Sequence, residues 1–197
     1  KNIPSEAGLG GGSSDAGFFL KLLNEHYGNV YNEKELEELA MKVGSDVPFF
    51  IKNKTARVGG KGNKVELVEN NLKDSLILVK PLGFGVSTKD AYNSFDELDE
   101  VRYANFEKIV ECLRNDNRKD LEKYIENGLE QGISERNADI KMFKAILNSV
   151  VPGKKFFMSG SGSIYYTFVT EIERSQIETR LRTFVDNVKI IISKTIN

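Results

Sequence analysis

The chain has 197 residues, which suits one large domain or two small ones, and two is the division we expect. Lysine and arginine together number 28 against 29 aspartates and glutamates, so the formal net charge is −1. A charge this close to zero leaves no basic footprint for nucleic acid or for an anionic membrane, and we expect neither as a partner.

The cysteine usage and the lack of long apolar runs indicate the compartment. Cys112 is the single cysteine, so it cannot form an internal disulfide and is typical of a thiol in a reducing environment. No apolar run approaches the roughly 18 residues of a membrane span, and no secretory signal opens the chain. We therefore expect a cytoplasmic location. Because the chain begins at Lys1 and not at a methionine, we also expect that a segment preceding it is missing.

A glycine-rich loop near the N-terminus is the most informative stretch. Four glycines fall within the five residues 8–12, and two serines and an aspartate follow them. Glycines let the backbone turn several N–H groups toward one point, and the serines can begin a helix whose positive end faces the same point. Such an arrangement binds an anion, above all a phosphate. The candidate phosphate-binding residues are Gly8, Leu9, Gly10, Gly11, Gly12, Ser13 and Ser14.

This loop differs from the two common phosphate motifs. A Walker-type loop needs a lysine directly after its last glycine, where Ser13 stands, and the dinucleotide-binding motif needs a preceding strand. The alternative is a flexible glycine–serine linker. The loop runs directly into an apolar helical pattern, Ala16, Phe19, Leu20 and Leu23, which a linker would lack.

Periodicity and capping residues predict the elements of the first domain. Asn32 and Glu35 have the spacing of a capping box, and Asp46 falls in a tight loop directly before an apolar strand. The expected elements are a helix over 14–25, a helix over 33–43, a strand near 47–51, and a hairpin of strands 55–58 and 64–68 that closes the first domain near residue 74.

The rest of the chain predicts a second domain that ends in the order strand, strand, helix, strand. Ser87 and Thr88 can cap a short helix that carries Ala91 and Tyr92. The expected elements are a strand over 75–80, helices around 88–92, 106–113, 121–129 and 140–150, strands over 155–158 and 164–169 joined by the loop 159–163, a helix over 172–184 and a strand over 188–193.

Three separated stretches carry a resemblance to a known family. They are residues 4–16, residues 44–50 (Gly-Ser-Asp-Val-Pro-Phe-Phe) and residues 158–163 (Met-Ser-Gly-Ser-Gly-Ser). Their order and content resemble the GHMP kinase superfamily, small-molecule kinases whose phosphate loop is of the Pro-x-x-x-Gly-Leu-Gly-x-Ser-Ser type. With Lys1-Asn2-Ile3-Pro4, with Lys80-Pro81 and with the run from Gly85 to Tyr92, the chain resembles more narrowly the members that act on a cytidine diphosphate-linked methylerythritol.

The resemblance implies a fold and a reaction. The fold would be α+β with two GHMP-kinase-like domains: residues 1–74 would form the remainder of the N-terminal ATP-binding domain, and residues 75–197 an antiparallel sheet with helices on one face. The reaction would transfer the γ-phosphoryl group of ATP, with Mg²⁺, to the 2-hydroxyl of the methylerythritol unit, in the non-mevalonate route to isoprenoid precursors. The protein would be a monomer or a homodimer that binds a small-molecule substrate, a cytidine diphosphate-linked polyol.

The resemblance also implies roles for particular residues. Residues 8–14 would hold the ATP phosphates, and Ser13 or Ser14 could contact the magnesium ion; no other metal ligand is assigned. Asp46 would accept the hydroxyl proton. Gly160, Ser161 and Gly162 would close over the substrate phosphates, and Tyr92 would stack on the cytosine ring. A lysine and an aromatic–histidine pair usual in such kinases would lie before Lys1, so neither can be assigned.

Other interpretations remain open for these residues. Asp46 could be a turn aspartate bonded to the backbone near Pro48, residues 159–163 could be a plain hairpin loop, and Tyr92 could only pack its helix on the sheet. For the whole chain, the alternatives are another GHMP kinase, acting on homoserine, mevalonate or a sugar, or a catalytically silent nucleotide-binding fragment.

Overall fold

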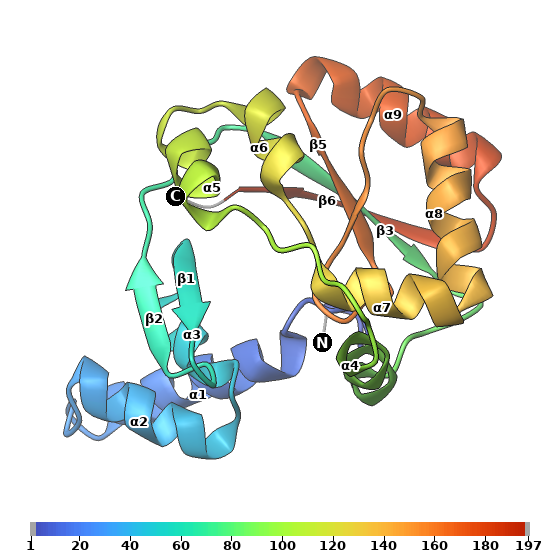
Figure 1. The fold of residues 1–197 in the computed structure, drawn as a ribbon. Coiled ribbons are helices and arrows are strands. Elements are labelled where there is room, and N and C mark those ends of the chain that lie inside the picture. The colour runs from blue at the N-terminus through green and yellow to red at the C-terminus, as the bar shows by residue number, and fades with distance from the viewer. Residues whose placement is uncertain (1–2, 196–197) are drawn as a thin grey trace. The chain divides into compact units, whose positions relative to one another are not determined.

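The computed structural model describes residues 3–195, which fall into two compact units (Figure 1). Residues 3–5 and 10–70 belong to unit 1, and residues 6–9 and 71–195 belong to unit 2. Lys1 and Asn2 of the N-terminal motif lie outside the described residues. Across the part of the chain that is described, no helix has the length and apolar character needed to cross a membrane.

Unit 1 is built from three helices and a two-stranded hairpin. The core joins Leu36 and Ala40 to Val47 and Ile51. Helix α2 begins with the expected capping box, because Asn32 accepts from the N–H of Glu35 and Glu35 accepts from that of Asn32. The elements are α1 (Gly11–His26), α2 (Glu33–Val43), α3 (Val47–Lys52), β1 (Ala56–Gly59) and β2 (Lys64–Leu67), and β1 pairs antiparallel with β2.

Two predictions for unit 1 were wrong in detail. The apolar stretch after Asp46 is the short helix α3, not a strand, and Pro48 stands in its first turn, where its missing N–H costs nothing. Val47 and Ile51 both reach the core because helical residues four apart share one face. Helix α1 begins at Gly11, three residues earlier than expected, because Gly10 adopts a left-handed conformation (φ 62°) and turns the chain directly into the helix.

Unit 2 is organised around a four-stranded antiparallel sheet in the order β4-β5-β3-β6. Ile77 pairs with Thr167 on one side and with Ile192 on the other. The strands are β3 (Ser75–Pro81), β4 (Phe157–Met158), β5 (Tyr165–Val169) and β6 (Val188–Lys194). The helices are α4 (Thr88–Asp96), α5 (Phe106–Arg114), α6 (Arg118–Tyr124), α7 (Gly128–Arg136), α8 (Ala138–Val150) and α9 (Glu171–Phe184).

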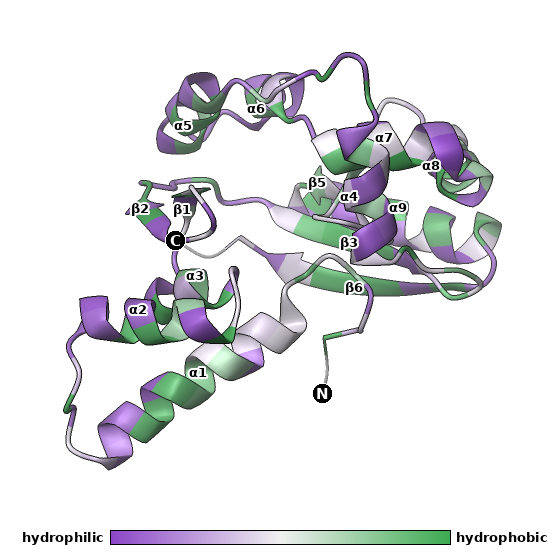
Figure 2. Cartoon of the chain, turned by 60° about the horizontal axis from the view of Figure 1, so that its bottom comes forward, coloured by the Kyte–Doolittle hydropathy of each residue, from purple (hydrophilic) through white to green (hydrophobic). Residues whose placement is uncertain are grey.

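One face of this sheet carries the larger core of unit 2. Ile77, Val79 and Tyr165 point to this face and are fully buried against α4, α7, α8 and α9. Strand β3, which lies between β5 and β6, is largely hydrophobic in Figure 2, as expected for a central strand that is covered. The antiparallel sheet with helices over a face is therefore confirmed.

The opposite face of the sheet is also covered in part. Phe157 and Phe168 pack there with Cys112 of α5 and Leu121 of α6, and Ala7 packs beside Leu78 and Ile164 in a separate cluster. We expected helices on one face of the sheet, and the structure has helices on both faces. Both faces can be covered because β3 and β5 carry apolar residues on each of their two sides.

The helix expected over 121–129 is two helices. Helix α6 ends at Tyr124, and Asn127 begins α7 by accepting from the N–H groups of Leu129 and Glu130. The apolar spacing continues across this break, so periodicity alone does not show it. The Asn-Gly-Leu-Glu run does show it, since an asparagine three residues before a glutamate is a helix-start signal.

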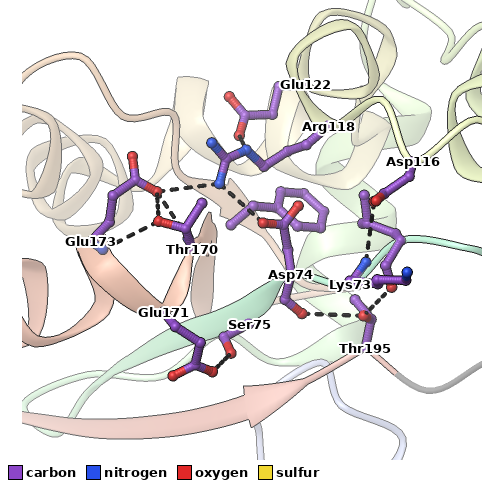
Figure 3. A network of polar contacts seen from close by, with 12 residues as sticks. Lys73, Asp74, Ser75, Asp116, Arg118, Glu122, Thr170, Glu171, Glu173 and Thr195 are labelled. Carbon is purple, nitrogen blue, oxygen red and sulfur yellow. Dashed lines mark hydrogen bonds and ion pairs between the residues drawn. The ribbon is translucent and has the colours of Figure 1, made fainter.

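A polar network fastens the start of α9 to the neighbouring elements (Figure 3). The carboxylate of Glu173 lies 2.8 Å from Lys154 Nζ and 3.3 Å from Arg118, and Arg118 also lies 3.2 Å from Asp74. Burial raises the pKa of Glu173, but the hydrogen bonds from Lys154 and Thr170 outweigh it and lower that pKa to about 2. At Asp74 burial is the stronger effect, and it raises the pKa despite Arg118.

These opposite shifts predict opposite pH dependences of stability. Because the pKa of Glu173 falls from 4.5 to about 2 on folding, its ionised form stabilises the folded state above pH 4.5, and this contribution is lost between pH 4.5 and 2. The free energy of unfolding of wild type minus that of Glu173→Gln should therefore shrink over that range in urea titrations. Asp74→Asn should give the reverse slope, since the raised pKa of Asp74 makes its ionised form destabilising. A pH-independent difference for Glu173→Gln would contradict the assignment.

Candidate functional site

The N-terminus of α1 is suited to an anion. The first intrahelical bond is donated by Ser14 to Gly10, so the N–H groups of Gly11, Gly12 and Ser13 have no acceptor within the helix. No acidic residue lies in the first turn of α1. The aligned peptide dipoles place partial positive charge at the same end, which favours a phosphate.

Of the two serines proposed for magnesium, Ser13 is the more available. The hydroxyl of Ser14 is buried and donates to Gly11 O at 2.9 Å, whereas Ser13 is only partly buried. Among residues 3–195 no group of three or more histidine, cysteine, aspartate or glutamate side chains could hold a metal ion. The donor set therefore fits a magnesium ion only if bound phosphates supply most of its ligands, which is how magnesium is commonly held.

Asp46 lies at the start of α3, which packs against the first turns of α1. Gly17 allows this contact, since a Cβ there would lie 2.7 Å from Phe50 Cβ. Asp46 is exposed and makes no capping hydrogen bond to α3, although it occupies the N-cap position. The turn-aspartate interpretation required such a bond to the backbone near Pro48, so the structure favours the carboxylate being available to a ligand.

In unit 2, the first part of the glycine loop interlocks with a second glycine loop, which comprises residues 159–163. Ser159 Oγ donates to Gly8 O at 2.9 Å, and Ser163 N donates to Glu6 O at 3.4 Å. Gly8 has a φ of 65°, and a Cβ there would lie 1.8 Å from Ser159 O. Residues 159–163 do form a hairpin turn, as the plainer interpretation proposed, but this turn is also bonded to residues 6–8.

Tyr92 lies on α4, whose N-terminus meets the second glycine loop. The Thr88 and Ser161 hydroxyls are 3.2 Å apart, and Ser87 caps the helix by accepting from Asp90 N, as expected. Tyr92 is 54% exposed, and its neighbour Ala91 is the residue that packs on the sheet. More than half of the Tyr92 surface is therefore open to solvent, which a stacking role would require.

The candidate residues therefore form one group in each unit. In unit 1 they are Gly10 to Ser14 at the start of α1 and Asp46 on the helix packed against it. In unit 2 they are Gly8, Leu9, Gly160, Ser161 and Gly162, with Tyr92 on the helix that meets the second glycine loop.

Comparisons with known proteins identify the family of the chain. Residues 1–54 match the GHMP kinases N terminal domain. The chain is 79% identical over all 197 residues to a 4-diphosphocytidyl-2-C-methyl-D-erythritol kinase from Fusobacterium nucleatum and covers 67% of that protein. It is 35% identical over 183 residues to an enzyme of the same name from Clostridium botulinum, covering 90% of this chain and 62% of the relative. The chain belongs to the 4-diphosphocytidyl-2-C-methyl-D-erythritol kinase family.

Solved structures support the same family. A crystal structure of 4-(cytidine 5'-diphospho)-2C-methyl-D-erythritol kinase matches with a TM-score of 0.77 and 26% identity, covering 98% of this chain and 68% of that one. A homoserine kinase from Cytophaga hutchinsonii matches with a TM-score of 0.73 at 16% identity, over all of this chain and 68% of the other, which shows a shared fold. The predicted GHMP kinase fold and kinase class are confirmed. The chain spans about two thirds of the length of these relatives.

Sequence reasoning missed the residues of α7 that hold the second glycine loop of this kinase. Asn127 Nδ2 donates to Met158 O and Gly160 O, and the buried Glu130 accepts from Met158 N. The helix-start signal at Asn127 could have revealed α7, but nothing in the sequence shows which loop its side chain contacts.

Gly8 and Gly12 offer a matched test of the first glycine loop. We expect Gly8→Ala to lower the free energy of unfolding by more than about 1 kcal/mol, because alanine disfavours a positive φ and its Cβ would overlap Ser159 O. A Cβ at Gly12 would have no neighbour within 4 Å, so Gly12→Ala should change the value by less than about 1 kcal/mol. Urea unfolding followed by circular dichroism measures both, and equal effects would contradict the close approach.

Proposed function

We propose that this kinase transfers the γ-phosphoryl group of ATP to the 2-hydroxyl of 4-diphosphocytidyl-2-C-methyl-D-erythritol, a step of the non-mevalonate route to isoprenoid precursors. The observation that carries the proposal is the 79% identity, over every residue of this chain, to a kinase named for that substrate. The free amides at the start of α1 and the exposed Asp46 support it, because they are the groups that such a transfer needs.

The phosphates of ATP would bind at the first glycine loop. Phosphoryl transfer asks for positioning and charge stabilisation more than for covalent chemistry, and the amides of Gly11, Gly12 and Ser13 supply fixed partial positive charge without a lysine. Ser13, together with the phosphates, would hold a magnesium ion, whose chemistry when bound is to neutralise charge on the phosphate oxygens.

Asp46 would accept the proton of the substrate hydroxyl as its oxygen bonds to the γ-phosphorus and ADP departs. A general base of this kind contributes about 10² to 10⁴ in rate. The exposed carboxylate is not engaged in capping its own helix, so it can accept a hydrogen bond from an alcohol.

The substrate would be recognised by unit 2. Gly160, Ser161 and Gly162 would bind the diphosphate, since both glycines have positive φ and such turns gather N–H groups. Tyr92 would stack on cytosine with its exposed ring. An aromatic platform suits a cytidylyl group and is not needed by a kinase of homoserine, mevalonate or a simple sugar. We also propose that the protein works in the cytoplasm as a monomer or a homodimer.

The substrate is tested by measuring ATP-dependent phosphorylation by the complete gene product. We expect kcat/KM for the cytidylyl substrate to exceed that for homoserine, mevalonate and galactose by at least about 10³, since a site built for polar contacts rejects analogues that lack them. Comparable rates for any of the three would refute the assignment. ATP-analogue binding without turnover of any alcohol would favour the alternative of a silent nucleotide-binding protein.

The role of Asp46 is tested by Asp46→Asn in the same protein. Asparagine keeps the shape but cannot accept the proton, so we expect kcat to fall at least about tenfold. The Kd for an ATP analogue and the melting temperature should stay near the wild-type values, because Asp46 makes no capping bond that the substitution would remove. An unchanged kcat would exclude Asp46 from the chemistry.

A further inference from the structure

The side-chain amide of Asn127 connects α7 to the second glycine loop. Its Nδ2 donates to Met158 O at 2.9 Å and to Gly160 O at 2.8 Å. Its Oδ1 accepts from the N–H groups of Leu129 and Glu130, at 3.0 and 3.3 Å, and so begins α7. Both donors and the acceptor of the amide are thus used.

This pattern is specific to an amide side chain. Aspartate, serine and threonine cap helices about as well as asparagine, but aspartate has no donor when ionised and a hydroxyl has only one. Helix capping alone therefore does not explain asparagine at position 127. The two bonds to the loop do.

The bond to Gly160 fixes the direction of the next amide. A trans peptide is planar, and its C=O and N–H point in opposite directions. Because Gly160 O faces Asn127, the N–H of Ser161 is turned away from α7. Ser161 is only partly buried, whereas Gly162 and Ser163, which follow it, are buried.

Glu130 bonds the backbone N–H of Met158, the residue that precedes the loop. Its buried carboxylate accepts from Met158 N at 3.3 Å and lies 2.5 Å from Lys144 Nζ. Met158 is therefore bonded at its N–H by Glu130 and at its C=O by Asn127, both from the start of α7. The strand end that leads into the loop has little freedom to rotate.

Helix α7 is in turn packed closely against α4, the helix that carries Tyr92; the two lie next to each other in Figure 1. A Cβ at Gly132 would lie 2.6 Å from the backbone of Ser94 and Phe95, so the two helices approach at backbone distance. The loop that would bind phosphate and the tyrosine that would stack on the base are therefore both positioned by α7.

We propose that Asn127 is a positioning residue for recognition of the substrate diphosphate: by holding the Gly160 carbonyl, it aims the Ser161 amide at a phosphate oxygen. This inference rests on the proposed function for the phosphate, while the orientation of the loop rests on the hydrogen bonds alone. The side chain itself does not touch the reacting atoms.

The test compares Asn127→Asp and Asn127→Ser with Asn137→Asp in the complete gene product. All three keep a side chain that can cap a helix, and Asn137, also partly buried, caps α8 through Ile140 N. We expect both Asn127 variants to raise the KM for the cytidylyl substrate at least about tenfold, because even a small displacement of a binding group weakens its contact with the substrate. The KM for ATP and the melting temperature should change little, and Asn137→Asp should match wild type. The serine variant excludes simple charge repulsion by the new carboxylate.

A second measurement does not depend on the substrate. Amide hydrogen exchange of residues 159–163 without ligand should become faster in both Asn127 variants and stay unchanged in Asn137→Asp, because Gly162 N donates to Ser159 O within the loop and Ser163 N donates to Glu6 O only while the loop is ordered. Unchanged exchange in the loop, or a KM within twofold of wild type, would overturn the proposal. Wild-type protein that fails to turn over the cytidylyl substrate would refute the proposed function instead, and would leave the exchange result to decide the role of Asn127 in the loop.

Discussion

The close approach of two backbone segments within unit 2 is the constraint on which the candidate substrate site depends. Gly8 and Gly160 meet so tightly that a Cβ on Gly8 would overlap Ser159 O and one on Gly160 would lie 2.9 Å from Gly8 O. Only glycine combines this contact with a positive φ at both positions. A loop near residue 8 and a loop near residue 160 thereby become one surface, although about 150 residues separate them in sequence.

This constraint explains why the glycines of the first loop have different physical roles. Gly8 belongs to unit 2 and is needed for its contact with Ser159, whereas Gly10 belongs to unit 1 and is needed for its left-handed turn into α1. A Cβ at Gly12 would have no neighbour within 4 Å, and in the proposed function its missing side chain would leave the first helical turn open to the ATP phosphates. One glycine-rich motif therefore contains a residue needed for packing, a residue needed for a turn and a residue that leaves the surface open. The composition of the motif does not show which glycine does which.

The sequence predicted most of the elements because they depend on local rules. Capping at Asn32 and Ser87 and the short apolar runs over 75–80 and 164–169 act within a few residues, and the helix starts and strands predicted from them were confirmed. The helix α3 was missed because the apolar run over residues 47–51 fits a strand or a helix equally well until its packing partner is known. The candidate residues of the first glycine loop were proposed from their glycine pattern and the others from resemblance, but neither could show the bonds of Asn127, because these join positions that are distant in sequence.

The polar contacts of α7 show how a loop that we propose to bind a ligand can be ordered by a helix next to it. A phosphate-binding loop cannot be stabilised by filling it with side chains, since these would occupy the ligand's place. In this kinase α7 holds the loop through the carbonyls of Met158 and Gly160. The N–H groups of Ser159, Gly162 and Ser163 are bonded to other carbonyls, so the partly buried Ser161 carries the N–H that we propose for the ligand. Bonds to carbonyls also pull electron density toward the oxygen and strengthen each peptide N–H as a donor, because hydrogen bonds in a chain polarise one another. For the diphosphate site that we propose, the contact of Asn127 with Gly160 O would therefore also strengthen the Ser161 N–H as a donor to negative charge.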